Sequence, residues 1–537
     1  MKKTCLITIY VATLLIGMML LIAQAYSVRR IRHDDGISYL AATGHQGQYE
    51  TSIPESRWVQ AKQWQAFWTP DQFWCFKQIA RDLAAFDIHP PLYFWLLHIW
   101  TSLHGVTLAG GPLLNVPFHL VACLMIAASC RLLGCSRLVA AGAGLLWLFA
   151  GTNLSVASEA RQYSLLGAFS SLFIFFLLRF LRRPTFSAAL YLCLTSAAGL
   201  LTHYHFILLL AACGGLVAIQ ALINRQWRTF FMIVISIAAA ALLFVSLHPT
   251  FYLSFPRAAA QAQPFSRAEI PPRLRRVFLA LIEQFVPHQL ADPFVNFLSR
   301  NRLPILMVGV ICGVVCIYLA RRLSWRLPVR RIARLESVPI IGGSACFAAV
   351  ALLYVSCRSP RHVMGAKYLM LVTPLIFIAL GQVITWLTRS RKTWEVVAVV
   401  CLSVLQMTYG ILVTRETVAS ARGPQYNPLH NETQLVLDST ARGVLPSVLW
   451  HADPAMYVFA ASQKSLLSNS FPEPPYQEDL LYVSDQDYGN SEAGRGAVLQ
   501  ALSDHGFTVN ETLNTGLWYG KTYRLIRAEQ EGPGDRE

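Results

Sequence analysis

Two neighbouring carboxylates near the N-terminus are the first residues that could do chemistry. Asp34 and Asp35 follow a long apolar segment and a short run of basic residues. Because like charges placed side by side raise the pKa of one of them, such a pair suits a general base or a cation site. Asp34 and Asp35 are therefore candidate catalytic residues, and a divalent metal ion is left open as a cofactor. A solvated loop with a helix-capping aspartate is the alternative explanation.

A second polar group precedes a pair of prolines. Asp87 and His89 come just before Pro90 and Pro91, and Tyr93 follows them. Proline is tolerated in the first turn of a helix, so a helix is expected to begin here. Helix N-termini attract anions, which makes Asp87, His89 and Tyr93 candidate substrate-binding residues. A capping aspartate and an interfacial histidine would explain the same pattern.

Glu159, Arg161 and Tyr163 form a third polar group, at the start of an apolar stretch. A guanidinium binds a carboxylate or a phosphate through two parallel hydrogen bonds, so Arg161 can pair with Glu159 or with a bound phosphate. The alternative is an arginine that only reaches from an apolar helix to the lipid headgroups.

Two further groups complete the set of candidate substrate-binding residues. His203 and His205 are two positions apart, which is a poor spacing for a metal pair on a helix, and anchoring at a membrane interface is the alternative role. Arg361, Lys367 and Tyr368 precede another apolar stretch and could supply cations to an anionic ligand.

The composition indicates which elements must position these residues. Of 537 residues, 54% are hydrophobic and only 14% are charged, whereas soluble domains contain about 25% charged residues. An all-α polytopic membrane protein is therefore expected. Crossing about 30 Å of hydrocarbon takes about 17 to 25 residues. Eleven stretches without Asp, Glu, Lys or Arg have such a length, at roughly 6–26, 112–130, 138–157, 162–178, 185–202, 206–223, 229–247, 303–320, 337–356, 368–388 and 396–413.

The basic residues indicate the orientation of these spans. Starting from Lys2 and Lys3, every second connection between spans holds a short segment whose charged residues are all basic, flanked in two cases by a single acid, Glu336 or Glu395. This bias places these connections in the cytoplasm. The segments are Arg131–Arg137, Arg179–Arg183, Asn224–Arg228, Arg321–Arg334 and Arg389–Lys392. The net charge of +16 reflects this bias, so nucleic-acid binding is not expected. Regions 27–111, 248–302 and 414–537 then lie outside, together with all the polar groups above. Residues 90–104 are expected to form a helix at the outer interface, because one more crossing would place the arginine-rich loops outside.

Aromatic and basic residues alternate in the first outer region. This pattern is typical of an amphipathic segment at the membrane surface, with rings among the headgroups and bases near phosphates. Packing within the protein is the alternative. The residues are Arg57, Trp58, Lys62, Trp64, Phe67, Trp68, Phe73, Trp74, Phe76, Lys77 and Arg81.

The tail from 414 to 537 changes character. Short β-like runs alternate with turn residues and with one helix-like stretch, Ala497–His505, which indicates a small soluble α/β domain after a transmembrane domain of residues 1–413. The β-like runs are Leu435–Leu437, Val448–Trp450, Leu480–Val483 and Tyr519–Ile526.

In combination, these motifs resemble the GT-C superfamily of glycosyltransferases. The resemblance covers residues 1 to about 413 and is strongest for bacterial relatives of dolichyl-phosphate-mannose protein mannosyltransferases and of the lipid A aminoarabinose transferase. It is carried by the Asp34–Asp35 pair and by the motifs Asp87–Tyr93, Glu159–Tyr163, Thr202–Tyr204 and Lys367–Tyr368, the last followed by Pro374.

The resemblance implies a function and a place. Such enzymes move one hexosyl or pentosyl unit from a polyprenyl phosphate to a lipid, glycan or protein acceptor on the non-cytoplasmic face, here the periplasmic side of a bacterial inner membrane. It also implies that Asp34 or Asp35 is the catalytic carboxylate and that Arg161 and Lys367 hold the phosphate. The family usually has Arg at the position of Lys367, and Lys keeps the charge but loses bidentate binding.

A transporter or flippase of lipid-linked saccharides is the competing hypothesis. Such proteins usually carry ionisable residues near the middle of the bilayer. The eleven predicted spans contain no acidic residue, lysine or arginine, and the polar groups gather at span ends instead. A polytopic enzyme with its site at the membrane surface is therefore preferred, and eleven spans exceed what anchoring of the tail alone would need.

Overall fold

The computed structural model describes residues 3–287, 290, 293 and 366–527, except 263, 265, 390–391, 423–425, 439–444, 468–472, 477, 485–491, 516 and 519. The chain divides into two compact units, and each is described by itself. The helical unit comprises residues 1–25, 83–93 and 111–418, and the sheet unit comprises residues 26–82, 94–110 and 419–527 of the described chain.

Among the described residues, six helical segments are long and apolar enough to cross a membrane, so the chain is a multi-pass membrane protein. They are α1 (Lys3–Tyr26), α7 (Gly110–Leu132), α10 (Tyr163–Arg182), α14 (Trp227–Leu247), α22 (Lys392–Arg422) and a continuous run of α12 (Phe206–Leu209), the π-helix η2 (Leu210–Gly215) and α13 (Leu216–Ile223). A seventh span is possible if α8 (Arg137–Leu148) and α9 (Gly151–Ala157), bent by 54°, cross together.

The other predicted spans differ in length or lie outside the described residues. Residues 185–202 form α11 (Phe186–Thr202), an apolar helix of 17 residues, which is shorter than the six segments above. The stretch 368–388 begins as a 3-10 helix, η5 (Ala366–Leu371), and its α-helix α21 (Thr373–Leu387) starts only at Pro374, whose ring suits a first turn. The predicted spans 303–320 and 337–356, and with them Arg361, lie outside the described residues.

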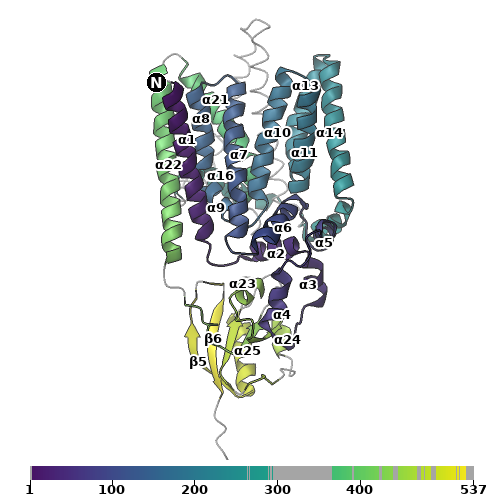
Figure 1. Cartoon of the computed structure of the whole chain (residues 1–537), viewed down its shortest axis with the longest axis vertical. Coiled ribbons are helices and arrows are strands. Elements are labelled where there is room, and N and C mark those ends of the chain that lie inside the picture. The colour runs from purple at the N-terminus through teal and green to yellow at the C-terminus, as the bar shows by residue number, and fades with distance from the viewer. Residues whose placement is uncertain are drawn as a thin grey trace, which may run out of the picture. The chain divides into compact units, whose positions relative to one another are not determined.

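Helix ends in the helical unit follow from local sequence. Ser136 and Thr185 cap α8 and α11, because each hydroxyl oxygen accepts a hydrogen bond from the backbone N–H three residues later. The helices α10, α11, α13 and α14 pack side by side, as do α8 and α21 (Figure 1). The side chain of Gln24 on α1 donates to Thr414 Oγ1 on α22 over 2.9 Å, which joins the first and last of the described spans.

Short helices follow α14 in the same unit: η3 (Phe251–Leu253), α15 (Ser254–Gln261), η4 (Arg267–Glu269) and α16 (Ile270–Ile282). Arg273 of α16 is 1% exposed and forms an ion pair of 3.4 Å with Glu269, one turn earlier. A buried arginine is costly unless it is paired, so this ion pair fixes the start of α16.

The sheet unit is built around six strands in the order β1-β3-β2-β4-β6-β5 (Figure 1). The central strand β2 runs parallel to β3 and β4, and the other pairings are antiparallel. The strands are β1 (Trp58–Gln60), β2 (Gln434–Asp438), β3 (Tyr457–Ala461), β4 (Leu480–Ser484), β5 (Phe507–Leu513) and β6 (Lys521–Arg527). The helices are α2 (His33–Thr43), α3 (Gln46–Ser52), α4 (Ala61–Gln65), η1 (Ala66–Trp68), α23 (Leu445–Leu449), α24 (Gln463–Leu467) and α25 (Glu492–Asp504).

The tail is thus strand and helix, as expected, but one of its elements was predicted wrongly. Val448–Trp450 is not a strand: α23 ends at Leu449, and Pro446 lies in its first turn, where proline favours a helix. The strands β3 and β5 were not predicted. Strand β1, from the first outer region, pairs with β3, so the sheet unit combines the tail with residues 26–82.

The aromatic segment of the first outer region has two kinds of residue. Trp64, Phe67 and Trp68 are buried inside the protein, which is the packing alternative. Phe73 and Trp74 are 42% and 80% exposed and remain available to another surface.

Two helices contain residues of both units. The boundary between the units falls after residue 82 in α5 (Phe76–Phe86) and after residue 93 in α6 (Leu92–His104). With 13 residues α6 is about 20 Å long, too short to cross a membrane alone.

Candidate functional site

A hydrogen-bonded chain of three side chains forms the centre of the site, in the helical unit. The Asp87 carboxylate accepts from His89 Nδ1 over 2.7 Å and from the backbone N–H of Ile88. His89 Nε2 lies 3.3 Å from a terminal nitrogen of Arg161, which can only donate. His89 must then accept at Nε2 and donate at Nδ1, so the chain of bonds fixes one tautomer and the direction of the guanidinium.

Burial makes this chain of bonds strong. His89 is 8% and Arg161 is 5% exposed. Burial alone would raise the pKa of the Asp87 carboxyl, but His89, its hydrogen bond and the Arg161 charge outweigh burial and lower the pKa to about 2. Asp87 is therefore an anion at any physiological pH and is suited to hold a cation rather than to take up a proton.

A second cation lies in the same site, on a segment distant in sequence. Lys367 of η5 has its Nζ 4.0 Å from Glu159 Oε2 and 5.5 Å from the centre of the Tyr163 ring. Its side chain is 24% exposed, more than that of Arg161, so it is the more accessible of the two cations. The sequence analysis expected Arg161 to pair with Glu159 or with a bound phosphate. The structure adds His89 as a partner of Arg161 and Lys367 as a partner of Glu159.

Aromatic rings connect the two cations. Tyr163 contacts the rings of Tyr368 and His203, at 5.3 and 5.8 Å between centres, and His203 also contacts His89 at 5.8 Å. His203 is 6% exposed, so it packs inside the protein rather than anchoring at an interface. We call the set that these contacts join the polar cluster: Asp87, His89, Glu159, Arg161, Tyr163, His203, Lys367 and Tyr368.

The two histidines between α11 and α12 are held neutral. His205 donates its backbone N–H to His203 Nδ1 over 3.2 Å. Burial lowers the pKa of His203 well below its ordinary value, and repulsion by Arg161 and by the protonated forms of His205 and His89 adds to this. Burial, with His89, lowers the pKa of His205 to about 4. At neutral pH, positive charge in the polar cluster therefore comes from Arg161 and Lys367.

A residue that the sequence analysis missed supports the turn carrying Glu159 and Arg161. Asn115 on α7 is fully buried, and its side-chain amide donates to the carbonyl oxygens of Ala157 at 3.1 Å and Glu159 at 2.6 Å. One turn later, His119 lies 3.0 Å from the Ser164 hydroxyl on α10. The spans were predicted from the absence of charged residues, and this criterion ignores neutral polar residues. An Asn or a His within an apolar span, such as Asn115 or His119, is the sequence signal that could have identified them.

The remaining candidates lie elsewhere. Asp34 and Asp35 are in the first turn of α2 in the sheet unit, where the helix dipole favours carboxylates, and Asp35 is 4% exposed. Their catalytic role stays a prediction. Tyr93 is fully buried in the first turn of α6, and Arg361 is outside the described residues. In the described part of the chain, no three His, Cys, Asp or Glu residues form a metal-binding group.

Comparison with known proteins identifies the fold. No protein-family model and no curated protein sequence matches the chain. The crystal structure of ArnT from Cupriavidus metallidurans bound to undecaprenyl phosphate aligns with 97% of this chain and 98% of that chain, at 14% identity and a TM-score of 0.54. The apo state of ArnT aligns over the same shares at a TM-score of 0.50. These likenesses confirm the expected GT-C fold.

Proposed function

We propose that this chain is an integral membrane glycosyltransferase that moves one sugar from a polyprenyl-phosphate carrier to an acceptor outside the cytoplasm. The observation that carries the proposal is the polar cluster, in which segments far apart in sequence bring two cations, Arg161 and Lys367, into one network. The fold supports it, because ArnT, which shares the fold, has been crystallised with undecaprenyl phosphate.

The charges of the reaction suit two cations. A carrier-linked sugar is a phosphodiester with one negative charge, and the phosphate that leaves is a monoester with a charge of about −1.5 to −2. Arg161 and Lys367 would therefore bind the transition state more tightly than the bound donor, which is the condition for lowering the barrier. The neutral His203 and His205 can supply hydrogen bonds without adding charge.

The acceptor hydroxyl needs a base, and Asp34 or Asp35 is proposed for that role. The hydroxyl oxygen attacks the sugar carbon, the bond from that carbon to the phosphate oxygen breaks, and its electron pair goes to the phosphate. The hydroxyl proton passes to the carboxylate. A single direct attack of this kind inverts the configuration at the sugar carbon.

The proposal extends to partners and to location. The donor is a hexosyl or pentosyl polyprenyl phosphate, the acceptor is a lipid, a glycan or a protein, and the enzyme lies in a bacterial inner membrane with its site and tail on the periplasmic side. The support for the orientation is the charge distribution in the sequence, in which basic residues strongly outnumber acidic residues in every second connection between spans.

A transfer assay tests the function. The purified chain in vesicles is incubated with radiolabelled polyprenyl-phosphate sugars and an extract of envelope lipids, glycans and proteins. We expect label to appear in one acceptor with the wild type and with Arg183→Gln, a control at the exposed opposite end of α10. Label that crosses the bilayer but remains on the carrier would instead identify a flippase and contradict the proposal.

A further inference from the structure

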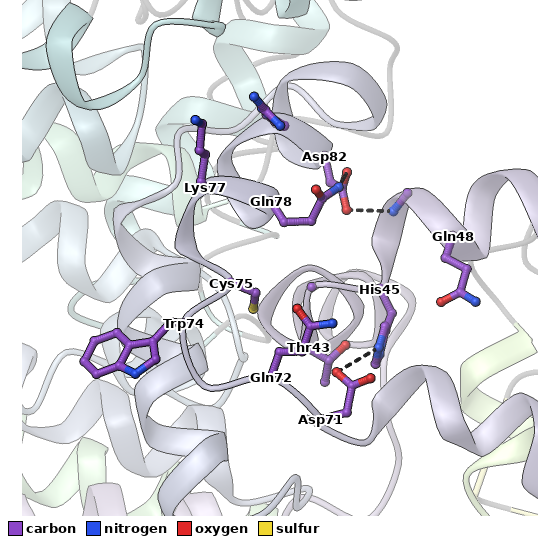
Figure 2. Close-up of a pocket in the computed structure, with 13 residues that line it drawn as sticks. Thr43, His45, Gln48, Asp71, Gln72, Trp74, Cys75, Lys77, Gln78 and Asp82 are labelled. Carbon is purple, nitrogen blue, oxygen red and sulfur yellow. Dashed lines mark hydrogen bonds and ion pairs between the residues drawn. The ribbon is translucent and has the colours of Figure 1, made fainter.

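A second possible ligand site lies in the sheet unit and shares no residue with the polar cluster. A cavity of about 530 Å³ is lined by the end of α2, the start of α3, the loop before α5 and the first turns of α5 (Figure 2). This volume is in the range of small-molecule sites, which is about 300–1,000 Å³.

One wall of the cavity is fixed by a buried carboxylate. Asp82 is 5% exposed; one of its oxygens accepts from the backbone N–H of Gly47 over 3.0 Å and the other from the side-chain amide of Gln78 over 2.7 Å. The bond from Gly47 joins α3 to α5, and the bond from Gln78, on the same helix as Asp82, holds the carboxylate in place (Figure 2). A Cβ atom at Gly47 would lie 2.7 Å from Asp82 Oδ1, so the approach of the two elements requires glycine.

The opposite wall is fixed by a histidine. The two ring nitrogens of His45 lie 3.2 Å from the Phe67 carbonyl oxygen and 3.2 Å from Asp71 Oδ1 (Figure 2). Gly44, just before it, has a φ of 79°, and a Cβ there would lie 2.9 Å from Cys75 Sγ. Left-handed backbone and lack of space both favour glycine at this position. The cavity is therefore formed by the fold before any ligand arrives.

Two cations of the lining have no such partner. Lys77 and Arg81 are exposed and lie four residues apart on α5, and their side chains make no ion pair or hydrogen bond with any residue of the described chain. Like charges at this spacing destabilise a helix, and positive charge near its N-terminus opposes the helix dipole. The lining carboxylates do not offset this positive charge, because Asp71 is paired with His45, and Asp82 is bonded to Gly47 and Gln78. An anionic ligand bound between Lys77 and Arg81 would offset it.

The remaining polar lining is suited to hydroxyl groups. Gln48 and Gln72 are exposed, and neither side-chain amide bonds to another described residue. An amide offers two donors and an acceptor, and can therefore bind neighbouring hydroxyls of a sugar ring. Figure 2 shows Gln48 and Gln72 on opposite sides of His45, on α3 and on the loop before α5.

We propose that this cavity binds a small anionic saccharide, with a phosphate held between Lys77 and Arg81 and ring hydroxyls held by Gln48 and Gln72. This inference goes beyond the proposed glycosyl transfer and does not depend on it, because the cavity belongs to different segments and binding can be measured without any transfer. A transferase without such binding, or binding without transferase activity, would separate the two proposals.

Calorimetric titration of the full chain tests this site. The protein is kept in a zwitterionic detergent, because sugar-headed detergents would compete, and is titrated with glucose 6-phosphate, glucose and inorganic phosphate. We expect saturable binding that is tightest for glucose 6-phosphate. Lys77→Gln and Arg81→Gln should each weaken it by about tenfold or more, the scale of one charge-assisted hydrogen bond. Gln48→Leu should weaken binding of glucose 6-phosphate but not of phosphate.

Lys62→Gln is the matched control, since Lys62 is an exposed lysine of α4 in the same unit and does not line the cavity. It should bind glucose 6-phosphate like the wild type, and every variant should elute like the wild type. Three results would overturn the proposal: no saturable binding of glucose 6-phosphate, unchanged affinity in both Lys77→Gln and Arg81→Gln, or equal affinity for inorganic phosphate and glucose 6-phosphate.

Discussion

Arg161 and Lys367 each lie next to a hydrogen-bonding or charged partner within the protein before any donor binds. His89 holds Arg161 and is itself held by the ionised Asp87, whereas Lys367 lies beside Glu159. In the proposed reaction these partners have two effects. They orient the cations in advance, which reduces the reorganisation that the transition state requires. They also offset part of the positive charge, so that the spent carrier phosphate can leave.

The carboxylates differ in their expected contributions to the rate. We predict that Asp34→Asn or Asp35→Asn lowers the transfer rate by at least about 10²-fold, the scale of one general base. Asp87→Asn should cost less, because an amide oxygen still accepts from His89 and only the charge is lost. The rates are compared at saturating donor, after each variant is shown to be folded. Full turnover in both of the α2 variants would place the base elsewhere.

At the scale of elements, α7 holds the turn between α9 and α10 through one amide. Asn115→Ala removes the donor to the carbonyl oxygens of Ala157 and Glu159 and leaves these buried groups without it. We expect a loss of about 1–3 kcal/mol in the free energy of unfolding, together with a slower transfer rate. Thermal unfolding in detergent measures the first effect. An unchanged melting temperature would show that the turn is held by other contacts.

The turn between α11 and α12 makes stability depend on pH. The pKa of His205 is lowered from about 6.5 to about 4, so between these values the unfolded chain binds a proton that the folded chain does not. Stability is therefore full above about pH 6.5 and falls as the pH drops towards 4. We expect His205→Gln to show a smaller loss of melting temperature over that range than the wild type or the exposed control His104→Gln. Equal losses in all three would exclude this contribution.

At the scale of the whole molecule, the charge distribution makes a topological prediction. Reporters that are active only in the periplasm should be inactive when fused at Arg182 or Lys392 and active when fused after the last residue. The physical reason is that the segments Arg179–Arg183 and Arg389–Lys392 carry only basic charged residues, which are retained in the cytoplasm. The opposite pattern would contradict the proposed orientation and place the segments around Arg182 and Lys392 outside the cytoplasm.

The sequence predicted most of the spans, because the absence of charge over about 20 residues is a strong signal. It also identified most of the polar cluster from residue type and position. The bend between α8 and α9 and the late start of α21 were not predicted, since hydrophobicity alone does not determine where a helix is interrupted. Val448–Trp450 was misassigned because a short apolar run fits a strand or a buried helix equally well.

The partners within the site could not be predicted either. Arg161 bonds to His89, 72 positions earlier in the chain, and Glu159 faces Lys367, about 200 positions later. Which pairs form depends on how α6, α10 and η5 pack, and this is tertiary information that residue spacing does not contain. The same is true of the pairing of β1 with β3, which joins segments about 400 positions apart.

The central claim is that the polar cluster binds the carrier phosphate more tightly as the sugar leaves, and steady-state transfer at saturating carrier lipid tests it most directly. We predict that Arg161→Gln and Lys367→Gln each lower the maximal rate, and not only the affinity for the carrier, because the contact strengthens in the transition state. Lys367→Arg should retain most of the rate, since it keeps the charge. If both Gln variants kept the maximal rate of the wild type, whether or not their Michaelis constant rose, the claim that these cations stabilise the transition state would be contradicted.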